Sequence, residues 1–139
     1  MKKLILMLTI AGFAISLLLS SPTAAQLIPP AKKAAHVAIT QGPEVELANA
    51  NEVIIRWTSN NPGGSDEHFG VVRYGKTRGD LSQTAKSHIR LNQQHSYTVF
   101  RVRVQGLEPH TTYYYKVDST EANGTSDGVS SPTKKFTTE

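Results

Sequence analysis

The sequence contains no cysteine and only one tryptophan among its 139 residues. Without cysteine it has neither a disulfide framework nor a thiolate metal site, so any fold must be stabilised by its apolar core. A chain of this length holds one modest core, which excludes a multidomain enzyme. Beyond residue 36, no window of a dozen residues shows the three-four spacing of an amphipathic helix. These absences leave a small domain that is built from strands.

Most of the chain also lacks a net charge of either sign. Four of the 15 basic residues lie near the N-terminus, at Lys2, Lys3, Lys32 and Lys33, and the remaining 11 equal the 11 acidic residues in number. A neutral domain offers nucleic acid no surface that releases counterions. We therefore expect no nucleic-acid partner and assign the extra positive charge to a targeting segment and a linker.

The N-terminal segment has the three parts of a secretory signal. Lys2 and Lys3 precede an apolar run of 16 residues, Leu4 to Leu19, and small residues then lead to a predicted cleavage site after Ala25. Because the run is shorter than the roughly 20 residues that span a bilayer, we favour a cleaved signal over an uncleaved anchor. Residues 1–25 are interpreted as a signal peptide. The protein is expected to be secreted, periplasmic or in the cell envelope, with the membrane involved only in export.

The rest of the chain predicts a short linker and one all-β domain. Residues 26–35 contain two consecutive prolines and a lysine pair, as an extended linker does. From residue 36 to 139, alternation with period two recurs between turn-forming clusters. The expected strands are Val37–Thr40, Glu44–Leu47, Glu52–Thr58, His68–Tyr74, Lys86–Leu91, Tyr97–Val104, Thr111–Ser119 and Val129–Thr138. Seven to eight short strands in about 100 residues are typical of an immunoglobulin-like β-sandwich.

The alternation also predicts a positively charged face. Neighbouring residues of a strand point to opposite sides of the sheet, so a core position for Trp57 places Arg56 in solvent. The same parity puts Arg101 and Arg103 outside, on the strand beside that of Arg56. These three arginines are a candidate face for an anionic polymer or a carboxylated sugar. Solvated charges that keep sheets from pairing edge to edge are the competing interpretation.

A second candidate face is apolar. Phe69, Val71 and Tyr114 take the outward parity on two adjacent strands, where polar residues are expected. Exposed apolar clusters often mark an interface, and this one is a candidate docking face for an unidentified extracytoplasmic protein or polysaccharide. The alternative is that a loop or the linker covers it.

One stretch carries a family resemblance. The segment Leu107-Glu108-Pro109-His110-Thr111-Thr112-Tyr113-Tyr114-Tyr115-Lys116-Val117 is similar to the L-x-P-x-T-x-Y-x-Y-x-V pattern of fibronectin type III domains. In that pattern the Leu and Pro fix the crossing between the sheets, and the first Tyr turns its hydroxyl back onto the backbone of the crossing, the tyrosine corner. The resemblance gives structural roles to five residues, which are Trp57, Leu107, Pro109, Thr111 and Tyr113.

Nearly all of residues 36–139 resembles, more narrowly, the N-terminal domain of purple acid phosphatases. The segments that carry this likeness are His36–Pro43, Val53–Thr58, Val72–Gly75, the tyrosine-corner stretch and Phe136–Thr138. In that family the domain precedes a dinuclear-metal phosphatase domain and holds none of the chemistry. The resemblance therefore implies a non-catalytic module.

No catalytic residue, metal ligand or cofactor site is expected. Gly79-Asp80 resembles one metal-ligand motif of the phosphatases, but their other metal motifs are absent, and a two-metal site needs several converging ligands. The five histidines lack metal spacing and are expected at the surface or at strand ends. They are His36, His68, His88, His95 and His110.

The sequence therefore predicts an exported, non-catalytic β-sandwich that binds a protein, a glycan or the cell envelope. The alternative is an orphan N-terminal domain or companion of a metal-dependent acid phosphatase, inactive alone.

Overall fold

The computed structural model describes residues 33–91 and 94–139. The predicted signal peptide and most of the predicted linker lie outside these residues. The described chain forms eight strands: β1 Ile39–Ala48, β2 Glu52–Asn60, β3 Glu67–Gly75, β4 Gln83–Arg90, β5 Tyr97–Gln105, β6 Thr112–Glu121, β7 Ser126–Ser130 and β8 Lys134–Thr137. In this part of the chain no helix is long and apolar enough to cross a membrane.

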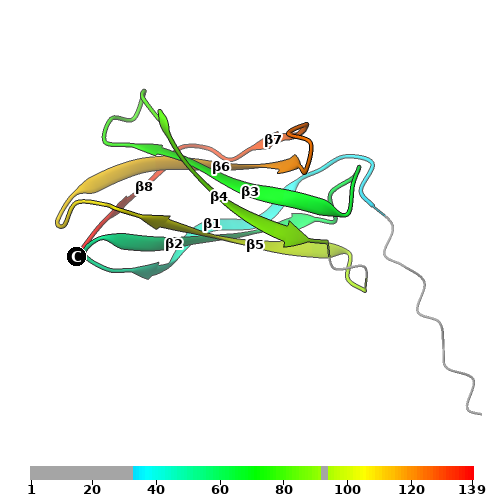
Figure 1. The fold of residues 1–139 in the computed structure, drawn as a ribbon, viewed down its shortest axis with the longest axis horizontal. Coiled ribbons are helices and arrows are strands. Elements are labelled where there is room, and N and C mark those ends of the chain that lie inside the picture. Colours follow the sequence, from blue (N-terminus) through cyan, green and yellow to red (C-terminus); the bar gives the residue numbers. More distant parts are fainter. Residues whose placement is uncertain (1–32, 92–93) are drawn as a thin grey trace, which may run out of the picture.

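The strands form two antiparallel sheets that pack face to face (Figure 1). One sheet has the order β1-β2-β5, and the other has the order β4-β3-β6-β7, with β8 also paired to β6. β8 pairs with the first half of β6 and β7 with its second half. This confirms the predicted all-β sandwich of seven to eight strands. It also confirms that the strand of Arg56 lies beside the strand of Arg101 and Arg103.

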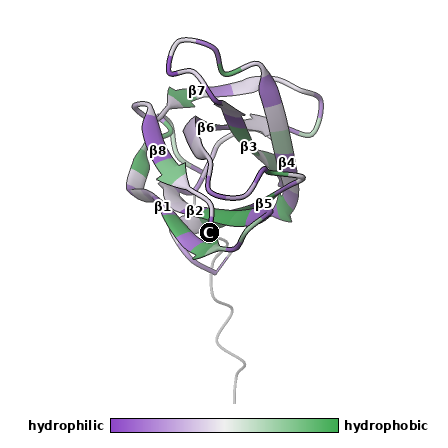
Figure 2. Ribbon diagram, turned by 90° about the vertical axis from the view of Figure 1, so that its left-hand side faces the viewer, coloured by the Kyte–Doolittle hydropathy of each residue, from purple (hydrophilic) through white to green (hydrophobic). Residues whose placement is uncertain are grey.

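The core lies between the two sheets and follows the predicted parity. Apolar and polar residues alternate along the strands, as the bands of colour in Figure 2 show. Trp57 is 1% exposed, and its ring stacks on that of Phe100 at a centroid distance of 5.1 Å. Gly70 of β3 faces this pair, because a methyl group there would lie 2.9 Å from Phe100 and 3.0 Å from Trp57. The missing side chain of Gly70 makes room for the stacked rings.

Two of the predicted strands are one continuous strand. β1 runs from Ile39 to Ala48, through the Gly42-Pro43 pair that was expected to separate two strands. Gly42 has φ +81, and a side chain there would meet the Arg56 carbonyl oxygen at 2.9 Å. β1 is the edge of its sheet, where proline is tolerated, and its register shifts around this pair. An irregular edge strand thus replaces the expected break between two strands.

The last predicted strand, in contrast, is divided in two. Ser131 exchanges two bonds with Val117 of β6: its N–H donates to the carbonyl oxygen at 2.9 Å, and its hydroxyl oxygen accepts from the N–H at 3.0 Å. Pro132 follows and has no N–H to donate. The chain leaves the ladder there and rejoins β6 at Lys134.

Candidate binding surface

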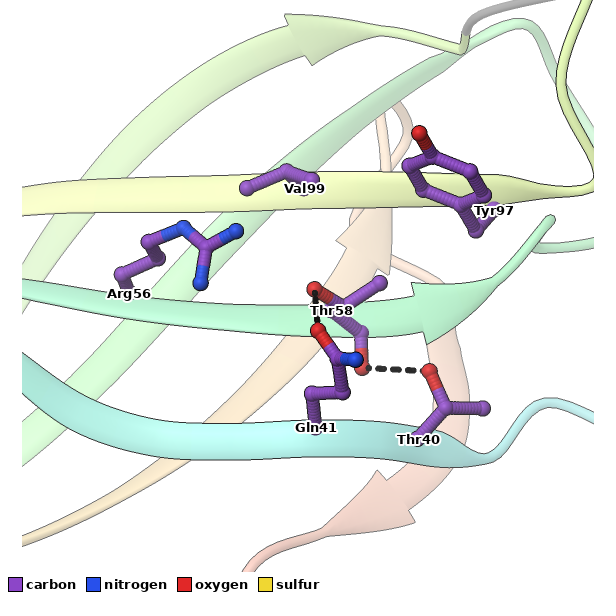
Figure 3. A pocket seen from close by; sticks show the side chains of 6 residues that line it. All are labelled: Thr40, Gln41, Arg56, Thr58, Tyr97 and Val99. Carbon is purple, nitrogen blue, oxygen red and sulfur yellow. Dashed lines mark hydrogen bonds between the residues drawn. The ribbon is translucent and has the colours of Figure 1, made fainter.

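The outer face of the three-stranded sheet contains a pocket of about 450 Å³. The strand register assembles it, because Thr58 of β2 lies between Gln41 of β1 and Val99 of β5. Tyr97 lies two residues before Val99 and shares its side of the sheet. Figure 3 shows the six side chains that line the pocket, which are Thr40, Gln41, Arg56, Thr58, Tyr97 and Val99.

Hydrogen-bonding groups form one side of this pocket. The Thr58 hydroxyl donates to Gln41 Oε1 at 3.5 Å, and the Thr40 hydroxyl donates to the Thr58 carbonyl oxygen at 3.3 Å (Figure 3). A glutamine amide nitrogen carries two N–H donors. Within residues 33–91 and 94–139, no partner is found for those of Gln41. Gln41 therefore has donors that remain available to a ligand.

An aromatic ring forms another side. Tyr97 is 46% exposed, and its ring lies 5.3 Å from that of His95 at an angle of 44°. Val45 and Leu47 are the other large apolar residues exposed in the described chain, and both lie further along β1, beyond Gln41. The pocket therefore places an accessible ring beside available hydrogen-bond donors.

The predicted arginine face exists, but each guanidinium group has a carboxylate partner on the same sheet. Arg56 and Arg101 are directly opposite each other in the register, and Arg103 lies two residues along β5. The ion pairs are Arg56–Glu44 at 2.9 Å, Arg101–Glu46 at 2.5 Å and Arg103–Glu52 at 2.8 Å. These carboxylates balance the arginines in number, which removes the attraction that an unpaired cluster would exert on a polyanion.

The predicted exposure of Val71 is wrong, because this residue is only 1% exposed. Its outward side chain lies on an inner strand, between Lys86 of β4 and Asp118 of β6 in the register. Asp118 also pairs with Arg73 at 3.1 Å. The long side chains of Lys86 and Arg73, the latter held by Asp118, can thus cover the short apolar side chain of Val71. Strand parity correctly predicts that the Val71 side chain points away from the core, but it does not predict that neighbouring side chains shield it from solvent.

The other two residues of the predicted apolar face lie toward opposite ends of the sheet. Phe69 is opposite Thr120 of β6, whereas Tyr114 is opposite Gly75 of β3. Six residues of extended strand, about 20 Å, separate Thr120 from Tyr114. Phe69 and Tyr114 are both half-buried, and Phe69 packs against the ring of His88 at 5.2 Å. The structure does not bring Phe69, Val71 and Tyr114 together into one exposed cluster.

The structural residues of the fibronectin pattern lie as expected. Leu107 and Tyr113 are buried, and the Tyr113 hydroxyl accepts a hydrogen bond from the Glu108 backbone N–H at 3.0 Å. The Thr111 hydroxyl donates to the Pro109 carbonyl oxygen at 2.8 Å. These contacts fix the crossing from β5 to β6.

A buried polar cluster was missed by the sequence analysis. His68 was expected at the surface or at a strand end. It does lie at the start of β3, but it is fully buried rather than at the surface. Its Nδ1 lies 2.9 Å from the Asp127 carboxylate, and its Nε2 lies 3.0 Å from the carbonyl oxygens of Gly63 and Ser65. Both ring nitrogens thus have hydrogen-bond partners inside the protein. The Ser119 hydroxyl donates to the same carboxylate oxygen at 2.6 Å.

The contacts of this cluster hold strands together and do not form a catalytic pair. Ser119 bonds to Asp127 rather than to His68, so the imidazole has no contact through which to take a hydroxyl proton as a general base. All three side chains are buried, and together they connect β3, β6 and β7. Within the described residues, no group of three or more His, Cys, Asp or Glu is arranged to hold a metal ion.

Comparison with known proteins gives a family match. Residues 40–138 match the family model described as the purple acid phosphatase N-terminal domain. None of the curated proteins matches the chain.

Among solved structures, the short form of the sensor domain of the anti-sigma factor RsgI4 of Pseudobacteroides cellulosolvens is 22% identical, with a TM-score of 0.52. The match covers 76% of this chain and 97% of that one. The long form of that domain is 21% identical, with a TM-score of 0.50 and coverage of 73% and 88%. The fn3 domain of human contactin 1 is 16% identical, with a TM-score of 0.49 and coverage of 86% and 92%.

Proposed function

The chain belongs to the family of purple acid phosphatase N-terminal domains, and we propose that it acts as an exported binding module. The domain is a non-catalytic, fibronectin-type sandwich. Its partner is an extracytoplasmic component of the cell envelope or its surroundings. The outer face of the β1-β2-β5 sheet makes the contact.

The observation that carries this proposal is the pocket beside Tyr97. An exposed aromatic ring, amide donors that have no partner within residues 33–91 and 94–139, and threonine hydroxyls together give apolar contact and directional hydrogen bonds, the combination that small binding sites use. The pocket lies on strands of the rigid sandwich rather than on a long loop. Binding there would need little reorganisation of the protein.

Export is supported by the chain's first 25 residues, whose charged start, apolar run and small-residue end follow the pattern of a secretory signal. A domain without cysteine has no thiol to oxidise outside the cytoplasm. Both features are consistent with a protein that functions outside the cytoplasm.

The proposal is tested by expressing the full chain with a C-terminal tag and measuring how much is retained by the isolated cell envelope. We expect retention of the wild-type protein and its loss in Tyr97→Ala. Leu47→Ala is the matched control, because Leu47 is 41% exposed but lies away from the pocket. Absence of retention, or equal loss in both variants, would contradict the proposal.

A second candidate function rests on the family match alone. The domain would then be the companion of a separate metal-dependent acid phosphatase and would contribute to activity only beside it. Co-purification of the tagged chain with a metallophosphoesterase would favour this function. Metal-dependent hydrolysis of p-nitrophenyl phosphate by the chain alone, abolished in Asp80→Ala, would contradict both candidates.

A further inference from the structure

We infer that the pocket between Gln41 and Tyr97 binds a neutral saccharide, with one sugar ring packed against the Tyr97 ring. This inference rests on the proposed function and specifies its ligand. No local sequence pattern points to this pocket.

The aromatic side of the pocket fits a sugar ring. The face of a tyrosine ring is electronegative and attracts polarised hydrogens. A pyranose whose hydroxyl groups are all equatorial presents only C–H bonds on its two faces, so it can lie flat against such a ring. Tyr97 is accessible for this contact, and the adjoining His95 ring supports it from one side.

The polar side fits hydroxyl groups, each of which both donates and accepts hydrogen bonds. The pocket lining supplies both kinds of group. The Gln41 amide nitrogen and the Arg56 guanidinium are donors. The Thr40 and Thr58 hydroxyl groups, whose hydrogens are used within the pocket, are acceptors (Figure 3). Arg56 uses Nη1 for Glu44, which leaves further N–H groups.

The charge balance favours a neutral ligand over an anionic one. Arg56, the cation that lines the pocket, already has a carboxylate partner at 2.9 Å, as do the two arginines further along the sheet. An anionic sugar would have to compete with these carboxylates. A neutral sugar can bind without disrupting the ion pairs.

The small apolar area favours a saccharide over a protein. A protein interface needs a contiguous apolar centre surrounded by polar residues. Here Tyr97 stands apart from Val45 and Leu47, the other large apolar residues exposed in the described chain. One ring beside hydroxyl and amide groups is enough for a sugar but small for a protein partner.

The inference is tested by isothermal titration of the full-length protein with three probes: cellohexaose and chitohexaose, which are neutral, and polygalacturonate, which is anionic. We expect binding of at least one neutral probe, with little change between low and high salt. Tyr97→Ala should weaken it about tenfold, and Gln41→Ala should weaken it severalfold. Tyr97→Trp, which retains an aromatic ring, and Leu47→Ala should bind as the wild type does.

The outcomes separate this inference from the proposed function. Envelope retention without binding of either neutral probe, or neutral binding unchanged in Tyr97→Ala, overturns the saccharide site and leaves the binding module standing. Binding of polygalacturonate alone, lost in high salt, overturns the neutral site in favour of the arginine face. Retention that protease treatment of the envelope abolishes indicates a protein partner and also overturns the inference. Failure of both retention and titration overturns the two proposals together.

Discussion

The hydroxyl of Tyr113 accepts a hydrogen bond from the backbone N–H of Glu108 at 3.0 Å, across the turn that leads into β6. The ring is 3% exposed and stacks on Phe136 of β8. One side chain therefore connects the start of β6 both to the crossing before it and to the last strand.

Replacing Tyr113 by phenylalanine removes only the hydroxyl. The Glu108 N–H then loses its partner, so we expect the free energy of unfolding to fall by about 1 kcal/mol. The midpoint of urea denaturation measures this loss. Tyr114→Phe is the control, because Tyr114 points to the outer face of the same strand. An unchanged midpoint for Tyr113→Phe would show that the bond contributes nothing to stability.

Local patterns were sufficient to predict the corner and the sandwich. The spacing of Leu107, Pro109, Thr111 and Tyr113 specifies one turn, and alternation with period two places each strand's core face. Strand ends were harder to predict. Gly42-Pro43 looks like a turn in sequence, and only its position on an edge strand lets the chain continue in one direction.

A methyl group added at Gly70 should be costly. It would lie 2.9 Å from Phe100, 3.0 Å from Trp57 and 3.1 Å from Val102, so the core side chains must shift to admit it. We expect Gly70→Ala to lower the free energy of unfolding by about 1–3 kcal/mol, as overpacked cores do. Gly79→Ala is the matched control, because a methyl group there meets nothing within 4 Å. Equal denaturation midpoints for the two variants would refute the packing argument.

The buried His68–Asp127 pair should contribute more to stability than an exposed pair of the same kind. Removing the Asp127 carboxylate leaves the buried His68 Nδ1 and the Ser119 hydroxyl without their shared partner, so Asp127→Ala is expected to cost about 1–3 kcal/mol for each of these two groups. The exposed His88–Glu67 pair, at 3.5 Å, is the comparison. There, Glu67 also pairs with Arg90 and so keeps a partner in His88→Gln. This variant also loses the ring contact with Phe69 and should lower the free energy of unfolding by less than about 1 kcal/mol. Similar losses in chemical denaturation for Asp127→Ala and His88→Gln would contradict this ranking.

Only part of the buried cluster of His68, Ser119 and Asp127 could be predicted from the sequence. His68 has the same parity as Val72 and Tyr74, which lie in the core, so alternation along this strand already points His68 inward. Its partner Asp127 lies 59 residues away on a short strand, and no local pattern pairs the two. The pocket beside Tyr97 was missed for a similar reason, because Gln41, Thr58 and Tyr97 meet only through the register of three strands.

Alkaline pH should destabilise the domain through its buried tyrosines. Burial raises the pKa of Tyr115 from its ordinary value of 10 to about 12, and the Glu44 carboxylate adds to the increase. Burial, with a smaller contribution from Tyr113, also raises the pKa of Tyr74. Between pH 10 and 12 the unfolded chain has lost the Tyr115 proton while the folded protein still holds it. Stability is therefore fully present below pH 10 and falls as the pH rises through this window.

The variant Tyr115→Phe isolates this contribution. At pH 7 the tyrosine is neutral in both states, so the variant retains whatever stability its packing gives. Between pH 10 and 12 the wild-type free energy of unfolding should fall more steeply than that of the variant, by up to about 1.4 kcal/mol per pH unit. Urea denaturation at a series of pH values from 7 to 12 measures the difference, and titrating lysines affect both proteins alike. Parallel curves over the whole range would mean that the folded and unfolded states release the Tyr115 proton at the same pH.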